Sequence, residues 1–139
     1  MKIGRLAIVL AILAIAAAQT VSQAIVTNLD TANWIHEKGS PPGSEGVMLR
    51  TDTATGGMDL LVRFPAGHVI APHWHDSNER VFVAEGQLTL HQDQADKVIK
   101  TGGYAFLPAR EVQRLSCGSQ TRCTFYLSWD GKPDSHPAK

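Results

Sequence analysis

Residues 67–86 read GHVIAPHWHDSNERVFVAEG, and they hold the densest group of possible metal ligands in the chain. His73 and His75 are separated by one residue, and Glu79 follows after a short polar segment. On an extended strand, side chains two residues apart point to the same side. Residues 76–78 are turn formers, after which Glu79 keeps the parity of the histidines. The spacing predicts that His73, His75 and Glu79 converge on one interior point and bind a metal ion.

The residues that follow decide whether this group faces a core or the solvent. A histidine pair on a solvated strand face would leave Glu79 as an ordinary surface charge. Val81, Val83, Leu88 and Leu90 alternate along the next two segments, which is typical of strands that border a hydrophobic core. The apolar neighbours favour the interior metal site over the solvated pair.

Short alternating segments recur through the rest of the 139 residues, separated by Gly, Pro, Asn and Asp. After residue 24, no segment of convincing length has the period of a helix. We expect strands at residues 46–50, 58–64, 68–71, 79–84, 87–91, 97–100, 104–107, 112–117 and 123–129. So many strands in one small domain predict an all-β fold, either a closed barrel or a jelly roll of two sheets.

The N-terminal residues differ in character from the rest. Lys2 and Arg5 precede an uninterrupted apolar run over residues 6–18. The run is shorter than the roughly 20 residues of a membrane-spanning helix. Residues 1–24 are therefore predicted to be a secretory signal cleaved after Ala24, with an uncleaved anchor as the alternative. We expect the protein to be secreted, either extracellular or periplasmic, with no membrane contact after cleavage.

The remainder of the chain divides into three parts. Residues 25–45 are expected to be an irregular lead-in, residues 46–130 the barrel, and residues 131–139 a C-terminal tail that is loose from residue 133 onward. Overall charge is balanced, with 13 Lys and Arg against 13 Asp and Glu. This balance argues against a nucleic-acid partner.

The two cysteines, Cys117 and Cys123, are expected to pair, because thiols in exported proteins tend to become disulfides. Residues 118–122 are turn formers between two segments of strand character, which predicts a hairpin closed by the disulfide. A cysteine metal site is the alternative, but it needs more sulfur or a nearby histidine in the sequence.

The group in residues 67–86 closely resembles the first motif of the cupin superfamily. Every position of that motif is filled: Gly67, His73, His75, Glu79 and Gly86. The resemblance covers most of the expected barrel, about residues 46–129. It implies a small β-barrel that holds one metal ion, but no single reaction, since cupins include isomerases, dioxygenases, decarboxylases, lyases, sugar binders and storage proteins.

The second cupin motif is matched only at its start, by Gly102 and Pro108. Where a glycine, a fourth metal-binding residue and an asparagine usually follow, this chain has Arg110, Gln113 and Cys117. The usual fourth ligand is a histidine. The departure at Gln113 leaves the predicted site with two imidazoles, one carboxylate and one amide.

Gln113 is predicted to be the polar member of an apolar interior row. The row consists of Gln113, Leu115, Cys117, Cys123, Phe125, Leu127 and Trp129. A buried amide without partners costs about 1–3 kcal/mol. Gln113 is therefore expected either to coordinate the metal through its carbonyl oxygen or to hydrogen-bond Glu79 or a ligand imidazole. Both residues are candidate catalytic residues, and Glu79 either binds the ion or handles protons beside it.

Copper is the favoured ion, with iron, manganese, nickel and zinc as alternatives. The chain resembles small secreted single-domain cupins, among which copper-dependent oxidative cleavage of cellulose is known. That resemblance implies a polysaccharide substrate, an external electron donor, and peroxide or dioxygen as oxidant. The alternatives are a non-redox sugar isomerase or lyase, a non-haem iron dioxygenase, and a non-catalytic carbohydrate- or metal-binding module.

Aromatic side chains are the candidates for contact with sugar, because their apolar faces match those of pyranose rings. Trp74, Tyr104 and Tyr126 are the candidate substrate-binding residues. Trp74 lies between the two histidines and points to the other side of its strand, so it is either a platform or part of a homodimer interface. Tyr126 alternates with apolar neighbours and is expected to face away from the barrel interior.

Overall fold

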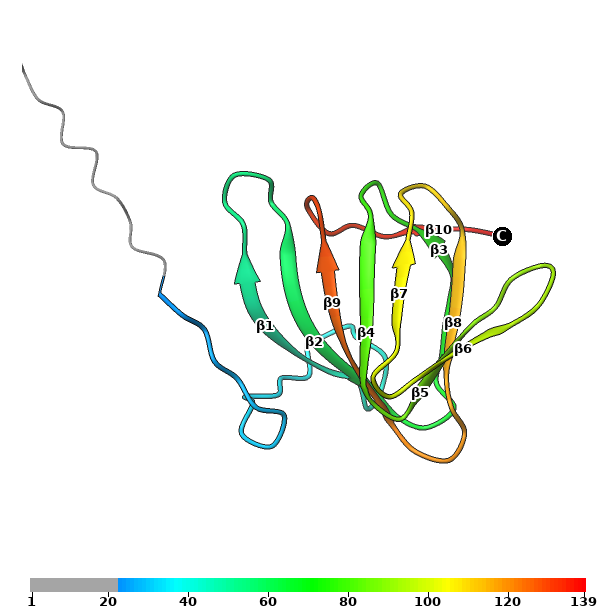
Figure 1. Ribbon diagram of the computed structural model, residues 1–139, viewed down its shortest axis with the longest axis horizontal. Coiled ribbons are helices and arrows are strands. Elements are labelled where there is room, and N and C mark those ends of the chain that lie inside the picture. The colour runs from blue at the N-terminus through cyan, green and yellow to red at the C-terminus, as the bar shows by residue number, and fades with distance from the viewer. Residues whose placement is uncertain (1–22) are drawn as a thin grey trace, which may run out of the picture.

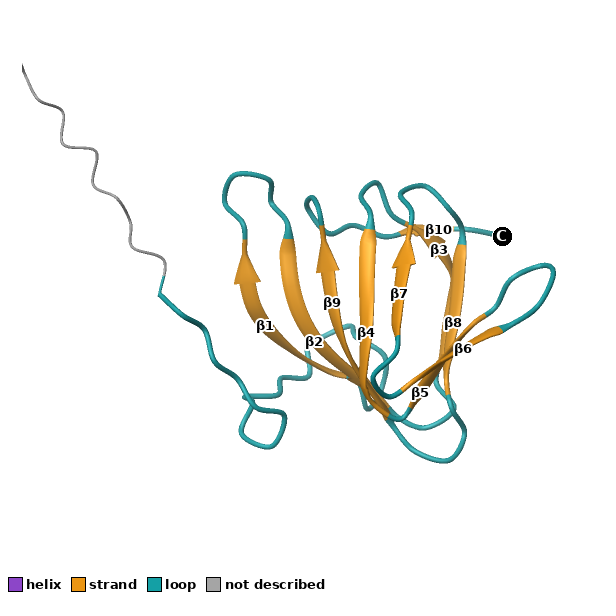
Figure 2. Cartoon of the chain, viewed as in Figure 1, coloured by secondary structure: helices purple, strands orange, loops and turns teal. Residues whose placement is uncertain are grey.

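The computed structural model describes residues 23–139, so the predicted secretory signal lies almost entirely outside the described residues. The described chain forms two antiparallel five-stranded sheets that face each other (Figures 1 and 2). The first sheet has the order β1-β2-β9-β4-β7, and the second has the order β10-β3-β8-β5-β6. The strands are β1 (Glu45–Thr51), β2 (Met58–Phe64), β3 (Val69–Trp74), β4 (Glu79–Glu85), β5 (Gln87–Leu90), β6 (Lys97–Lys100), β7 (Tyr104–Leu107), β8 (Gln113–Cys117), β9 (Cys123–Trp129) and β10 (His136–Pro137). The predicted all-β jelly roll in one domain is confirmed.

The predicted strands form close to their expected positions. β2, β6, β7 and β9 have the bounds that the sequence predicted. The largest difference is at β3, which was expected to end at Ala71 and continues to Trp74. Residues 23–139 contain no helix, and so none with the length and apolar character to span a membrane.

The C-terminal residues correct the expectation of a loose tail. His136 and Pro137 form β10, which pairs with Trp74 and His73 of β3. The second sheet therefore gains an edge strand beside the two histidines, as Figure 1 shows. A strand of two residues is too short to show an alternating pattern, and its partner lies far earlier in the chain, so no local pattern predicts it.

The core lies between the two sheets. Its buried residues are Val81, Val83, Leu88, Leu90, Ile99, Leu107, Leu115, Cys117, Cys123, Phe125, Leu127 and Trp129. A fully buried valine or leucine stabilises the fold by about 1.5–3 kcal/mol relative to an exposed one. All seven members of the predicted interior row from Gln113 to Trp129 are buried, which confirms the parity argument.

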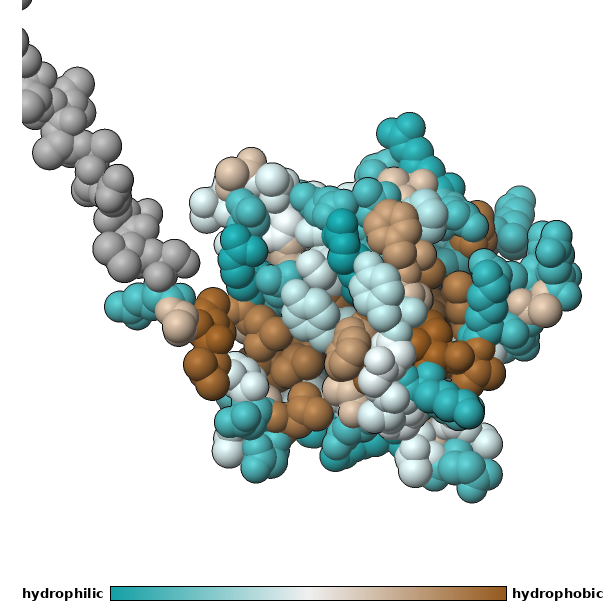
Figure 3. Space-filling model, viewed as in Figure 1, coloured by the Kyte–Doolittle hydropathy of each residue, from teal (hydrophilic) through white to brown (hydrophobic). Residues whose placement is uncertain are grey.

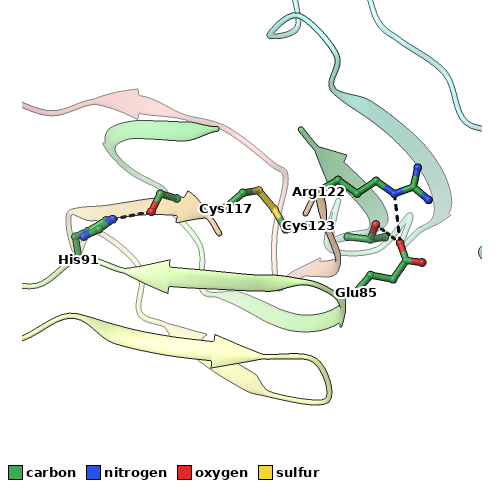
Figure 4. The surroundings of a disulfide bond; sticks show 7 residues. Glu85, His91, Cys117, Arg122 and Cys123 are labelled. Carbon is green, nitrogen blue, oxygen red and sulfur yellow. Dashed lines mark hydrogen bonds and ion pairs between the residues drawn. A yellow bond between two sulfur atoms is a disulfide. The ribbon is translucent and has the colours of Figure 1, made fainter. Parts of the chain in front are cut away.

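Cys117 and Cys123 form the predicted disulfide (Figure 4). The predicted hairpin is wrong, because β8 pairs with β3 and β5 whereas β9 pairs with β2 and β4. Residues 118–122 cross from one sheet to the other, and the disulfide joins the sheets at the end away from β10 (Figure 1). A strand-turn-strand pattern does not distinguish a hairpin from such a crossing.

Gly86 makes a second crossing between the sheets, from β4 to β5. Its φ is +69°, and a Cβ there would collide with the carbonyl oxygen of Arg122. Glycine accepts this conformation without steric cost. The crossing explains the last glycine of the first motif.

Arg110 stands where the second cupin motif has a glycine, and its φ of +64° lies in the region that favours glycine. A residue with a Cβ loses about 1–2 kcal/mol in this conformation. The Arg110 N–H donates to the carbonyl oxygen of His75 at 2.7 Å. The loop between β7 and β8 is thereby attached to the segment that carries the histidines.

Candidate metal centre

Three segments bring the predicted ligands to one end of the barrel. His73 lies in β3 directly opposite Gln113, the first residue of β8. His75 follows the end of β3, and Glu79 begins β4 in the facing sheet. The short loop between β3 and β4 crosses from the second sheet to the first, and it places the histidines and the carboxylate on facing walls.

Both histidines use the Nδ1 atom to bond a backbone carbonyl. His73 Nδ1 lies 2.7 Å from the carbonyl oxygen of Ala71, and His75 Nδ1 bonds the carbonyl oxygen of Asp134. A carbonyl oxygen only accepts, so Nδ1 of each ring carries a proton, and Nε2 holds the lone pair when the ring is neutral. Each Nε2 is then available to bind a metal ion, in the arrangement that outer hydrogen bonds impose on metal-binding imidazoles. The two rings lie 4.9 Å apart between centroids and are nearly perpendicular.

Glu79 connects His75 to Gln113 inside the barrel. Its Oε2 atom lies 3.1 Å from His75 Nε2 and accepts a hydrogen bond from Gln113 Nε2 at 2.7 Å. The exposed fractions of His75, Glu79 and Gln113 are 6%, 5% and 5%. Of the two roles expected for Gln113, the structure contains the hydrogen bond to Glu79, and coordination of a metal stays a prediction.

The other end of the Gln113 amide has no partner. Because the carboxylate can only accept, the amide nitrogen must face Glu79, and Gln113 Oε1 is left buried without a hydrogen bond. Such an orphaned acceptor costs about 1–3 kcal/mol. A cation beside it would satisfy it, so these residues fit a metal ion bound by imidazole nitrogen and oxygen donors.

Neighbouring carboxylate and carbonyl groups change the pKa of His75. Burial lowers the pKa of this imidazole, but the hydrogen bond and charge of Glu79, together with Asp134, outweigh burial and raise the pKa above its ordinary value. An ion that binds at Nε2 must displace a proton that Glu79 favours, so metal binding at this residue is coupled to proton release.

His73 is less closely joined to the group than the sequence predicted. Among residues 23–139, the acidic and imidazole side chains with ligand atoms all within 4.8 Å of one another are Asp76, Asp134 and His136. The predicted trio of His73, His75 and Glu79 is more widely spaced. Direct contact within it is between His75 and Glu79.

The C-terminal segment packs against this site, and sequence reasoning missed it. The distance from His136 Nε2 is 2.8 Å to Asp134 Oδ2 and 3.3 Å to Asp76 Oδ2. The His136 ring also stacks on Trp74 with 4.0 Å between centroids. Part of the Trp74 ring, expected to be a platform or a dimer contact, is thus covered by the chain itself.

The other aromatic candidates lie away from the centre. Tyr104 and Tyr126 both pair in register with Phe82 on the outer face of the first sheet, so Tyr126 faces outward as predicted. Trp129 is the aromatic residue that packs against His75, with 5.9 Å between ring centroids. Its indole Nε1 is buried without a partner.

A cavity of about 670 Å³ reaches the centre from one side. It lies between β6, β7 and the loop before β8, and Gln113 is part of its lining. Gln113, whose Nε2 holds Glu79 and whose Oε1 has no partner, therefore links this cavity to the His75–Glu79 pair.

The family model for the ChrR cupin-like domain matches residues 22–130. No curated protein matches this sequence. The match extends over most of the described chain and supports the cupin superfamily, but not the narrower resemblance to copper-dependent cellulose-cleaving cupins.

Solved structures share the fold at low sequence identity. KdgF from Halomonas sp. has a TM-score of 0.63 at 16% identity, over 78% of this chain and 94% of that chain. The polyketide cyclase RemF from Streptomyces resistomycificus has a TM-score of 0.65 at 18% identity, over 84% and 87%. The anti-sigma ChrR, solved with Rhodobacter sphaeroides SigE, has a TM-score of 0.61 at 16% identity, over 74% and 52%. At such identities the likeness establishes the fold alone.

Proposed function

Since this chain belongs to the ChrR cupin-like family, we propose that it is an enzyme built around a single metal ion. The proposed ligands are His73, His75, Glu79 and Gln113. Copper is the first candidate ion, and iron, manganese, nickel and zinc are the alternatives. The proposal includes export from the cytoplasm and assembly as a homodimer.

The observation that carries the proposal is the buried Gln113 side chain. Its Nε2 atom holds Glu79, while its Oε1 atom has no partner, next to an imidazole that also contacts Glu79. Structural amides in a core normally satisfy both ends. A site that leaves one oxygen free beside two available imidazole nitrogens is better suited to a cation than to packing alone.

Glu79 and Gln113 would have different roles beside a bound ion. A bound ion would polarise a substrate oxygen or lower the pKa of a bound water, and copper would add one-electron chemistry. Glu79 can hold a proton at its carboxylate oxygens, within reach of the ligand positions. Gln113 fixes the orientation of Glu79 through its N–H, and the surrounding core excludes bulk water.

A small organic substrate fits this site better than a polymer. The cavity that reaches Gln113 has the volume of a typical small-molecule site, about 300–1,000 Å³. RemF, which shares the fold, is by its name a polyketide cyclase, and this supports non-redox chemistry on a small molecule. We therefore place a metal-assisted isomerase, lyase or cyclase reaction first.

Copper-dependent oxidative cleavage of polysaccharide, with cellulose as the first substrate to test, is the second candidate. The donor set favours it, because two imidazoles with oxygen donors suit copper(II), which has the highest affinity among the divalent ions. This reaction would need peroxide or dioxygen and an external reductant. The outward placement of Tyr126, outside the lining of the cavity, weighs against its role as a sugar platform, whereas Tyr104 lines the outer part of the cavity.

The metal centre is tested by titration of metal-free protein with Cu²⁺ and Zn²⁺ in a calorimeter. We expect one ion per chain, and a loss of affinity of more than about 100-fold in His75→Ala. His91→Ala is the matched control, because His91 bonds Ser116 and Asp96 outside the site. Wild-type binding in His75→Ala, or no stoichiometric ion in the parent protein, would overturn the proposal.

The two reaction classes are separated by incubating copper-loaded protein with cellulose, ascorbate and peroxide. Oxidised oligosaccharides detected by mass spectrometry, and absent with His75→Ala, would establish the second candidate. Their absence from the copper-loaded parent protein would exclude it and leave the non-redox class, which must retain its turnover under strict anaerobiosis with zinc.

A further inference from the structure

The two sheets are not joined by strand pairing along the side of the barrel where β6 and β7 lie. β7 is the last strand of the first sheet and β6 is the last strand of the second, and the two do not pair. The cavity of about 670 Å³ lies along this gap. This side is therefore a lateral entrance, distinct from the end of the barrel that β10 borders.

The inner end of this entrance is chemically connected to the metal centre. Gln113 lines the cavity and carries the unpartnered buried oxygen. Through its Nε2 it holds Glu79, which contacts His75. A molecule in the cavity thus lies against the residue that joins the entrance to the candidate ligands.

Apolar side chains surround the outer part of the entrance. The large hydrophobic residues on its lining with high exposed fractions are Val98 at 52%, Tyr104 at 59%, Phe106 at 47% and Val112 at 56%. The space-filling view shows hydrophobic side chains gathered at the right, where β6 and β7 lie (Figure 3). Gathered exposed apolar residues around a hollow are typical of a ligand site.

Two lysines add positive charge to the same lining. Among residues 23–139, no carboxylate lies within 4.0 Å of Lys97 or Lys100, and Glu111 is the acidic residue of the lining. Lys97 pairs with Leu90, which is buried, so that Lys97 projects from the inward face of β6. Both lysines are exposed, and their charge exceeds that of Glu111, so the lining is complementary to an anionic ligand.

We propose that this entrance binds a small organic carboxylate with an apolar body. The carboxylate lies at Lys97, with Lys100 nearby, and the apolar body packs against Ala105 and Leu107 on the way to Gln113. This inference rests on the proposed function, because it names the substrate class of the same site. The contacts with the two lysines do not require the ion.

The experiment measures binding of phenylacetate, 4-phenylbutyrate and octanoate to the metal-free full-length protein, by two-dimensional NMR and calorimetry. The primary amides of the same three acids are the uncharged comparison. We expect at least one acid to bind, to shift backbone signals of β6 and β7, and to bind about tenfold more tightly than its amide.

Three variants assign the charge. Lys97→Gln should weaken the acid about tenfold and leave its amide unchanged, while Lys97→Arg should restore the acid. Lys132→Gln, at a lysine outside the lining, should have no effect. Equal binding of acids and amides, no binding of any acid at 10-fold molar excess in the millimolar range, or equal losses in Lys97→Gln and Lys132→Gln would overturn the proposal.

A metal titration of Lys97→Gln separates this inference from the proposed function. The ion should bind this variant as it binds the parent protein, because Lys97 is not a proposed ligand. Failure of the parent protein to bind any ion would defeat the metal-centre proposal, yet carboxylate binding would still be read independently from the NMR shifts.

Discussion

The Nδ1–H of His75 is donated to the backbone carbonyl oxygen of Asp134, a residue 59 positions later in the chain. This bond fixes the ring tautomer and leaves Nε2 directed to Glu79. Asp134 in turn accepts the backbone N–H of Asp76 at 3.1 Å. The last residues of the chain therefore determine the orientation of a candidate ligand at the end of β3.

Deletion of residues 134–139 should weaken ion binding much more than it weakens the fold. Loss of an outer hydrogen bond to a metal-binding imidazole costs about 10–100-fold in affinity. Calorimetric titration with Zn²⁺ measures the first effect and thermal unfolding the second. His136→Ala keeps the Asp134 carbonyl and should retain most of the affinity; a truncated chain with full affinity would contradict this role of the C-terminus.

Replacement of Gln113 should move ion affinity in a direction set by the new side chain. Gln113→His supplies a third imidazole and should raise affinity for Zn²⁺ and Cu²⁺ by about tenfold or more, since imidazole is a stronger donor than an amide oxygen. Gln113→Leu removes the donor and the hydrogen bond to Glu79, and should lower it. Equal affinities in the parent protein and both variants would show that position 113 does not reach the ion.

Arg110→Gly should stabilise the protein by about 0.5–1 kcal/mol. Relief of a left-handed backbone conformation gains about 1–2 kcal/mol, and the greater freedom of glycine in the unfolded chain removes part of it. The exposed ion pair of Arg110 with Asp76 adds little. Urea unfolding measures the change, with Arg114→Gly in β8 as a control that should be destabilised. An unchanged or lower midpoint in Arg110→Gly would refute the argument.

Asp130→Asn should lower stability at neutral pH and have progressively less effect in acid. Hydrogen bonds from Arg80 and then Asn78 lower the pKa of the Asp130 carboxyl below its ordinary value. The stabilisation is therefore present above the unfolded pKa of about 3.9 and disappears as the pH falls through the lower folded pKa. Unfolding midpoints from pH 7 to pH 2, with the exposed Asp93→Asn as control, measure it. A constant difference across this range would exclude the ionised pair as the cause.

The parts of the fold that the sequence predicted are those with local signals. Alternation located the nine longer strands, and parity placed Gln113 among buried residues, with a hydrogen bond to Glu79 as one of the alternatives for its amide. The pairing of Cys117 with Cys123 followed from their proximity in the chain and the expectation of export. Each of these inferences needs only neighbouring residues and the period of a strand.

The parts that were missed depend on contacts between distant segments. β10 is too short for a pattern, so its contacts with Trp74 and Asp76 were not foreseen. Whether residues 118–122 return to the same sheet or cross to the other depends on the pairing of β8 and β9 with other strands. The lateral entrance likewise arises from which strands end each sheet, and this no local motif encodes.

The disulfide between Cys117 and Cys123 holds the two sheets together covalently at one end of the barrel. Any separation of the two sheets is then most limited near the disulfide and least limited at the opposite end, where β10 lies (Figure 1). Reduction of the disulfide would remove this covalent link, and the two sheets would then be free to separate at both ends of the barrel.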